Sequence, residues 1–260
     1  MAGEISPHRE GAAMTSAGTC GAPSSPLFLT TRWSVVLTAQ DPDSPDAREA
    51  LEALCRSYWY PLYVYVRRSG HGSHDAQDLT QEFFARLLEK GWLNSADQER
   101  GRFRTFLITA LKRFLAREWH RENTQKRGGA FTFLALDAAD AENRYAREPE
   151  SAAEQAFERR WAMLLLEQTM DRLRTEYARL GKEADFLALK DWLSAGRREI
   201  PYENLAAQLG CSQGNARVSV HRLRKRFREL FRATVAETVS APEEIEPELQ
   251  HFAGVIARSV

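Results

Sequence analysis

Apolar residues recur at the spacing of an α-helix through most of this chain, and this spacing limits what the chain can fold into. Ala216, Val220, Leu223, Phe227 and Leu230 are a clear case, because steps of four and three residues place all five on one helix face. Strand-like alternation is scarce, and Gly and Pro stand between the periodic segments. We therefore expect an all-α fold of two small helical domains joined by a flexible linker, the second containing a helix-turn-helix.

The change of pattern along the chain predicts five parts. Residues 1–29 are small and polar, lack the apolar run of a secretory signal, and are expected to form a disordered tail. Residues 30–127 and 153–238 hold the periodic segments of the two domains. Residues 128–152, between them, have mixed composition and no sustained period, which is typical of a linker. Residues 239–260 are expected to add an amphipathic helix.

Composition narrows the class of protein. The chain has 260 residues, of which 43% are hydrophobic and 28% charged, as in a soluble globular protein. It contains no apolar run near eighteen residues, so we expect no membrane span. Cys20, Cys55 and Cys211 lie far apart and have no partner at metal-ligand spacing, so we expect no metal, no cofactor and a reducing cytoplasm.

A net charge of zero conceals two basic blocks. Residues 100–127 carry nine Lys or Arg and two acids, and residues 197–232 carry nine Lys or Arg and three acids. One basic run alone is as well explained by a solvated helix face. Two such blocks, each on a helix with a clear apolar stripe, favour binding to a polyanion such as a nucleic acid.

The second block has the pattern of a helix-turn-helix. A short apolar helix ends at Gly210, a residue that tolerates the left-handed backbone of a tight turn, and Ser212 is a good N-cap for the next helix. The alternative is an ordinary basic helix on a packed hairpin. The turn, the cap and the basic outer face together favour a recognition helix. That outer face carries Gly214, Arg217, Val218, His221, Arg222 and Lys225.

Two further segments, read together with this one, resemble a known family. "HDAQDLTQEFFARLL" (74–88) and "ERGRFRTFLITALKRFLAREWHRE" (99–122) are similar to region 2 of bacterial RNA polymerase sigma factors of the sigma-70 family, in the extracytoplasmic-function subgroup. The helix-turn-helix resembles region 4 of the same family. The resemblance spans residues 30–238 and implies a factor that binds core RNA polymerase and directs promoter recognition, DNA opening and transcription initiation. It implies no enzyme activity, and the chain shows no catalytic set of residues.

The resemblance implies three contacts in the first domain. Asp75, Asp78 and Glu82 share one helix face and would bind the β′ clamp helices of the polymerase, although acids at a helix N-terminus are also favoured without any partner. The loop 94–101 would receive a flipped base, and the helix after it would read the minus-10 element. We expect the aromatic residues of that helix, Phe103, Phe106, Phe114 and Trp119, to be core rather than stacked on bases. The implied minus-10 residues are Asn94, Ser95, Arg102, Arg104, Thr109, Lys112, Arg113 and His120.

The resemblance also implies two contacts in the second domain. Arg217, Val218, His221 and Arg222 match positions that face the minus-35 element, where Arg can read guanine and Val can meet a thymine methyl. We expect Arg224, Arg226 and Arg228 to touch phosphates or solvent. An apolar surface that includes Trp161 and Leu165 would bind the β flap of the polymerase. The implied minus-35 residues are Ser212, Gln213, Gly214, Arg217, Val218, His221, Arg222 and Lys225.

The chain departs from the family pattern in its clamp-binding helix. Gln77 stands where the family usually has Glu, and Thr80 stands where it has an apolar residue. We hypothesise that phosphorylation of Thr80 restores the missing charge, which would make a regulatory kinase a partner; the alternative is a neutral helical Thr. An anti-sigma factor is a second candidate regulator. Arg113, where the family often has Asn, indicates a different promoter preference.

Other readings remain open. The chain can instead be a stand-alone helix-turn-helix transcriptional regulator, which would bind a palindromic duplex without polymerase, or an adaptor that binds no DNA. The C-terminal helix leaves a second choice. Its acids can lie against the recognition helix and compete with DNA, or its apolar stripe can complete the domain core. The acids are Glu243, Glu244, Glu246 and Glu248, and the stripe is Ile245, Leu249, Phe252 and Ile256.

Overall fold

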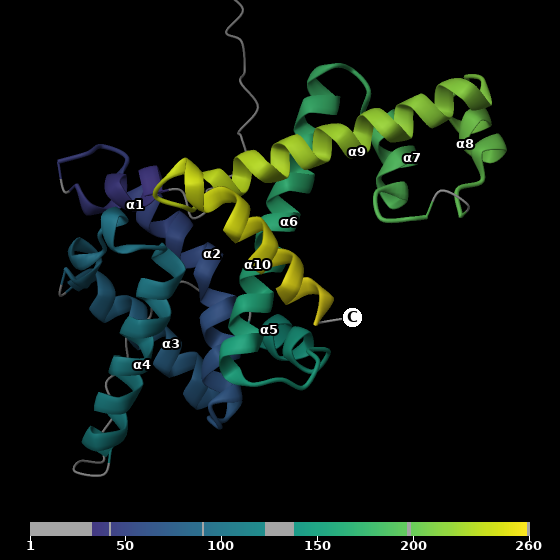
Figure 1. Cartoon of the computed structure of the whole chain (residues 1–260). Helices are drawn as coiled ribbons and strands as arrows, with labels where there is room; N and C mark the ends of the chain where they lie inside the picture. The colour runs from purple at the N-terminus through teal and green to yellow at the C-terminus, as the bar shows by residue number, and fades with distance from the viewer. Residues whose placement is uncertain (1–32, 42, 90, 123–137, 197–198, 259–260) are drawn as a thin grey trace, which may run out of the picture.

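The computed structural model describes residues 33–41, 43–89, 91–122, 138–196 and 199–258, and forms no strand within them. Cys20, the predicted disordered tail and residues 128–137 of the predicted linker lie outside the described residues. The all-α prediction is confirmed for the described part of the chain (Figure 1). The α-helices are α1 (Trp33–Gln40), α2 (Ala47–Arg68), α3 (Ser73–Glu89), α4 (Phe103–Glu122), α5 (Ala138–Tyr145), α6 (Ala153–Arg179), α7 (Glu183–Leu189), α8 (Tyr202–Gln208), α9 (Gln213–Ala236) and α10 (Ile245–Ala257).

The α2 helix contains a proline. It runs from Ala47 to Arg68 without interruption at Pro61. Proline removes one backbone hydrogen bond from a helix interior. Every residue from Tyr58 to Val66 is buried, so packing on all sides stabilises the helix where local propensity does not.

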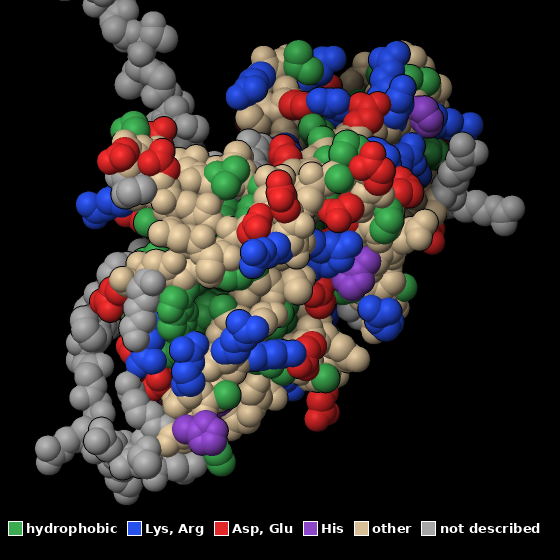
Figure 2. All heavy atoms as spheres, turned by 60° about the vertical axis from the view of Figure 1, so that its left-hand side comes forward, with side chains coloured by type: hydrophobic (Ala, Val, Ile, Leu, Met, Phe, Trp, Pro, Cys, Tyr) green, Lys and Arg blue, Asp and Glu red, His purple; other side chains and the backbone are tan. Residues whose placement is uncertain are grey.

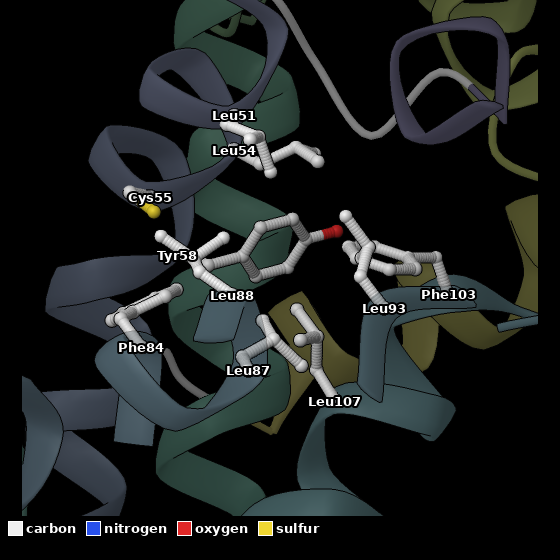
Figure 3. A pocket seen from close by; sticks show the side chains of 10 residues that line it. All are labelled: Leu51, Leu54, Cys55, Tyr58, Phe84, Leu87, Leu88, Leu93, Phe103 and Leu107. Carbon is white, nitrogen blue, oxygen red and sulfur yellow. The ribbon is translucent and has the colours of Figure 1, made fainter. Parts of the chain in front are cut away.

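The larger of two buried clusters in the described residues includes most of α2. Buried side chains of α1, α3, α4, α5 and the first half of α6 belong to the same cluster, together with Val235 at the end of α9 and Phe252 and Val255 of α10. We call this cluster the first core. At one point of it the Tyr58 ring lies among apolar side chains of α2, α3 and α4 (Figure 3). The cavity left there measures about 10 Å³, which has room for no more than about one water molecule.

A smaller cluster, the second core, joins the second half of α6 to α7, α8 and the first half of α9. Its buried members are Leu173, Phe186, Leu189, Ile200, Leu205, Ala206, Ala216, Val220, Leu223 and Leu230. Figure 1 shows the two long helices that connect the cores: α6 rises from the first to the second, and α9 returns across the top. The five residues of the α9 stripe face this core as predicted, with Phe227 only partly buried.

The two cores do not separate at the predicted linker. Trp161 and Leu165, which we placed in the second domain, are fully buried in the first core. The described end of the linker, residues 138–152, contains α5, and this helix is attached to α2. Glu142 accepts hydrogen bonds from the Tyr63 hydroxyl and from Arg67, whose Nε lies 2.8 Å from Oε1. The described residues therefore hold the end of the linker against the first core.

The C-terminal helix completes the first core. The Phe252 ring packs edge-on against Phe231 and Trp161, with centroid distances of 4.6 Å and 6.2 Å. The alternative, in which these acids lie against the recognition face of α9, is not seen among the described ion pairs. Glu246 pairs with Arg232 near the end of α9, and Glu248 reaches the start of α4. The α10 stripe needs burial, and the apolar surface between α6 and α9 supplies it.

Candidate nucleic-acid interface

The segment α8–turn–α9 has the local geometry that its sequence predicts. Gly210 adopts φ +61°, in the left-handed region that glycine tolerates best. The Cys211 amide donates to the Ala206 carbonyl at 3.0 Å and closes the turn. The Ser212 hydroxyl accepts from the Asn215 amide at 3.2 Å, which is an N-cap at the start of α9. Two helices therefore meet across a short, well-defined turn.

All eight implied minus-35 residues are exposed on the start of α9. The Arg217 guanidinium lies 5.0 Å from the Tyr202 ring of α8, a cation–π contact that limits where this side chain can point. Val218 is 45% exposed, and its exposed neighbours on this face are Arg217, His221 and Arg222. A hollow of about 890 Å³ opens on this face, lined by Ile200, Tyr202, Arg217, Val220, His221, Arg224 and Arg228.

Two of the three arginines that we expected to meet phosphate or solvent are held by the protein. Arg224 donates to the carbonyl oxygens of Trp192 and Ala195 and so anchors the segment before α8. Arg226 pairs with Glu176 of α6 at 2.6 Å and with Glu229 at 3.0 Å, and the hydrogen bond with Glu176 is the main cause of its raised pKa. Arg228 is exposed, as expected.

The predicted flipped-base loop lies on short 3-10 turns before α4. Asn94 and Ser95 are both exposed there, and the Ser95 hydroxyl donates to the Trp92 carbonyl at 2.6 Å. Gln40 of α1 anchors this loop, because its side-chain amide donates hydrogen bonds to the carbonyls of Leu93 and Ala96 at 2.7 Å and 2.9 Å. The loop is therefore braced while its two polar side chains face solvent.

Four of the implied minus-10 residues on α4 face solvent: Thr109, Lys112, Arg113 and His120. Lys112 is partly engaged, since its Nζ lies 2.8 Å from the Glu154 carboxylate of α6 and this hydrogen bond raises the pKa of the ammonium. The pair is half exposed and therefore weak in water, so a phosphate can compete for the lysine. In Figure 2, Lys and Arg gather low on the visible face and again at its upper right, with acids between them.

Arg102 and Arg104 do not join this surface, contrary to the prediction. Arg104 is only 3% exposed, because it points into the first core and pairs with Glu248 of α10 and with Glu158 of α6. Arg102 lies 2.7 Å from the other oxygen of Glu248 and keeps 30% of its side chain exposed. Both arginines belong to an interior ion-pair network.

Trp119 corrects the prediction for the aromatic residues of α4. Phe103 and Phe114 are buried and Phe106 is partly buried, as expected of core residues, but Trp119 is 62% exposed. Helical spacing explains the difference, because five residues beyond Phe114 correspond to about 140° around the axis. The centroids of the Trp119 and His120 rings lie 5.1 Å apart, and helical spacing places Trp119 about 20° around the α4 axis from Lys112.

The three implied clamp-binding acids differ in how exposed they are and in the ion pairs they form. Asp75 and Asp78 are exposed on α3, and a carboxylate oxygen of Asp78 lies 3.2 Å from Nδ1 of the exposed His74. Glu82 is partly buried and lies 2.8 Å from Arg86, which also binds Glu118 of α4. Asp75 and Asp78 thus remain open to a basic partner, while Glu82 links α3 to α4.

Thr80 does not have the accessibility that phosphorylation requires. The residue is fully buried in α3, and its hydroxyl donates to the Ala76 carbonyl at 2.7 Å. A phosphate there would bring close to two negative charges into an apolar interior. The neutral helical threonine, which was the alternative, agrees with this packing.

The predicted flap-binding surface is also closed, since Trp161 and Leu165 are fully buried. Large apolar side chains that are exposed among the described residues lie elsewhere. Two of them belong to the end of α6 and to α7: Leu180 is 70% exposed and Leu187 is 50% exposed. They lie on the outside of the second core.

The described residues contain no group of three or more His, Cys, Asp or Glu side chains that could hold a metal ion. Within the described part of the chain, no helix has both the length and the apolar character needed to cross a membrane.

One family model matches part of the chain. Residues 54–125 match the family model of sigma-70 region 2, a segment that begins inside α2 and ends just beyond α4. No curated protein and no solved structure matches the chain. The match supports a sigma factor of the sigma-70 family, with a role in binding RNA polymerase and melting promoters.

Proposed function

We propose that this chain is a sigma factor of the extracytoplasmic-function type, which binds core RNA polymerase and directs promoter recognition, DNA opening and transcription initiation. The observation that carries the proposal is the match of α2–α4 to sigma-70 region 2, on helices that expose acids on α3 and cations on α4. The chain would supply promoter choice and strand separation, and the polymerase would supply the chemistry.

The polymerase contact is assigned to α3. Asp75 and Asp78 are the acids that face solvent, so they would meet basic residues of the β′ clamp helices. Glu82 would act through Arg86, by fixing the angle between α3 and α4. The β flap would bind the second core near Leu180 and Leu187 instead of the buried Trp161 and Leu165.

Strand opening is assigned to the loop at Asn94 and Ser95 and to the exposed side of α4. Thr109, Lys112, Arg113 and His120 offer hydrogen-bond donors and cations along that side. Trp119 adds a large exposed ring beside them, and an aromatic ring can stack on a base of whatever sequence once the strands have parted.

Duplex recognition is assigned to the start of α9. Arg217 is steadied by Tyr202, and Val218, His221 and Arg222 are exposed on the same outer face. This combination of a guanidinium and an aliphatic side chain suits guanine and the thymine methyl in a major groove. Ser212, Gln213, Gly214 and Lys225 would meet the phosphates around them.

Core binding and promoter-directed transcription test the proposal. The chain should co-elute with core polymerase and yield a run-off product from a defined start site. Asp75→Asn with Asp78→Asn should weaken core binding, whereas Glu246→Gln, at an exposed acid of α10 that pairs with Arg232 and lies outside both proposed polymerase contacts, should leave it unchanged. Binding to a palindromic duplex without polymerase, and no product with it, would instead indicate a stand-alone regulator.

A further inference from the structure

A buried network of charges joins the C-terminal helix to the start of α4. The Glu248 carboxylate is fully buried between two arginines: Nη2 of Arg102 lies 2.7 Å from Oε2, and Nη1 of Arg104 binds Oε1. Arg104 also pairs with Glu158 of α6 at 3.1 Å, and Glu158 contacts His251 of α10 at 3.0 Å. The network spans three helices and links residues 144 positions apart in sequence.

The C-terminal segment also reaches the loop before α4. The Ser240 hydroxyl donates to the Gln98 carbonyl in that loop. A few residues earlier, the Glu237 carbonyl accepts from the Trp33 amide at 3.3 Å. Residues 237–248 thus contact both parts of the proposed minus-10 reader, its loop and the first turn of its helix.

A DNA phosphate can compete with Glu248 for the two arginines of this network. Arg104 donates a hydrogen bond to one oxygen of Glu248 and Arg102 forms an ion pair with the other, and a DNA phosphate can take both places because it is likewise an anion that accepts hydrogen bonds from guanidinium groups. Burying ions is costly, and such a pair is stable only while every partner is present. The network is therefore stable while all its members are paired with one another, and it weakens sharply once one of them binds another ligand.

We propose that α10 is an autoinhibitory latch, in which Glu248 holds Arg102 and Arg104 in place of DNA until nucleic acid and polymerase displace it. Opening the latch would release both arginines toward the strand bound by the exposed side of α4. It would also free Trp161, whose ring packs against Phe252 of α10 and against Arg104. The inference rests on the proposed function only in taking DNA as the displacing ligand.

The test compares two substitutions on one helix in the full chain. Glu248→Gln removes the buried charge and keeps the shape. Glu246→Gln is the matched control, because Glu246 forms an exposed pair with Arg232. Hydrogen–deuterium exchange of the free protein should become faster in segments 99–108 and 245–257 for Glu248→Gln alone. Affinity for a fluorescein-labelled single-stranded 30-mer should rise about tenfold, since a closed protein binds with its affinity reduced by the open fraction.

Adding Arg102→Ala and Arg104→Ala to Glu248→Gln should remove the gain in affinity. If Glu248→Gln does not fold, Glu248→Asp keeps the charge with a shorter reach and should give a smaller gain in the same direction. Faster exchange without tighter DNA binding would overturn the latch, because α10 would then be only a brace, and so would unchanged exchange. These readouts use no polymerase, so a failed transcription assay beside a positive result would reject the sigma function and leave the latch.

Discussion

The guanidinium carbon of Arg104 lies 4.0 Å from the centre of the Trp161 ring, inside the first core. The first residue was expected to hold DNA and the second to bind polymerase, and they come from the two predicted domains. A cation over an indole in a desolvated site is worth about 2 kcal/mol or more. The contact therefore contributes to holding α4 and α6 together in the closed protein.

Burial predicts that replacing two tryptophans will change the free energy of unfolding by very different amounts. Trp161→Ala should lower the free energy of unfolding by roughly 3–5 kcal/mol, because a fully buried ring leaves a cavity and exposes Arg104. Trp119→Ala should change it by less than about 0.5 kcal/mol, since that ring is mostly in solvent. Urea denaturation followed by circular dichroism measures both. Equal losses would contradict the assignment of Trp161 to the core.

Trp119 should matter for strand opening instead. Loss of one base–aromatic stack costs about 1–3 kcal/mol, so Trp119→Ala should reduce the amount of open complex by roughly fivefold to a hundredfold. The fluorescence of 2-aminopurine placed in the minus-10 element reports opening. Trp119→Phe keeps a ring and should retain most of the signal. An unaffected Trp119→Ala protein would remove this residue from the mechanism.

Thr80 should tolerate only small, neutral substitutions. Thr80→Glu places a carboxylate in a fully buried position without a partner and should cost at least about 2 kcal/mol of stability. Thr80→Ser keeps the hydroxyl that binds the Ala76 carbonyl and should remain near the parent. Thermal melting of the two variants decides the point. A stable Thr80→Glu protein that binds polymerase more tightly would restore the phosphorylation hypothesis.

Two arginines of α9 should differ in what they affect. Arg222 is exposed on the outer face, so Arg222→Ala should change the preferred minus-35 bases by about 1–3 kcal/mol if its contact is bidentate. Arg226 is held by Glu176 and Glu229, so Arg226→Ala should leave base preference unchanged and cost about 0–1 kcal/mol of stability. Holoenzyme binding to promoters with each minus-35 base exchanged separates them. A uniform loss from both would mean that neither reads a base.

Cys55 should be protected from thiol reagents. Burial, with a smaller effect from Glu52, raises the pKa of its thiol to about 12, so little thiolate forms at pH 8. Because the folded state holds this proton more tightly than the unfolded state, the stability contribution is complete below about pH 9 and is lost toward pH 12. In a Cys20→Ala background, iodoacetamide at pH 8 should label the partly exposed Cys211 and spare Cys55 until urea is added. Fast labelling of Cys55 in the native protein would contradict its burial.

Local features of the chain were determined by the sequence itself. The helical spacing predicted α9 and the residues of its buried stripe, and Gly210 and Ser212 predicted the turn and the cap before α9. These features depend on neighbours within a few positions, where spacing, glycine φ and an N-cap hydroxyl act directly. The exposed side of α9 followed from the same periodicity.

Which faces meet was decided only by the tertiary structure. Periodicity marked Trp161 and Leu165 as apolar, but it did not show that α2, a hundred residues earlier, covers them. It marked Arg104 as basic, but not that Glu248 lies beside it. Thr80 looked like a free hydroxyl until the packing of α3 enclosed it. The choice of partner for each face depends on burial summed over segments far apart in the chain, and no local window contains that sum.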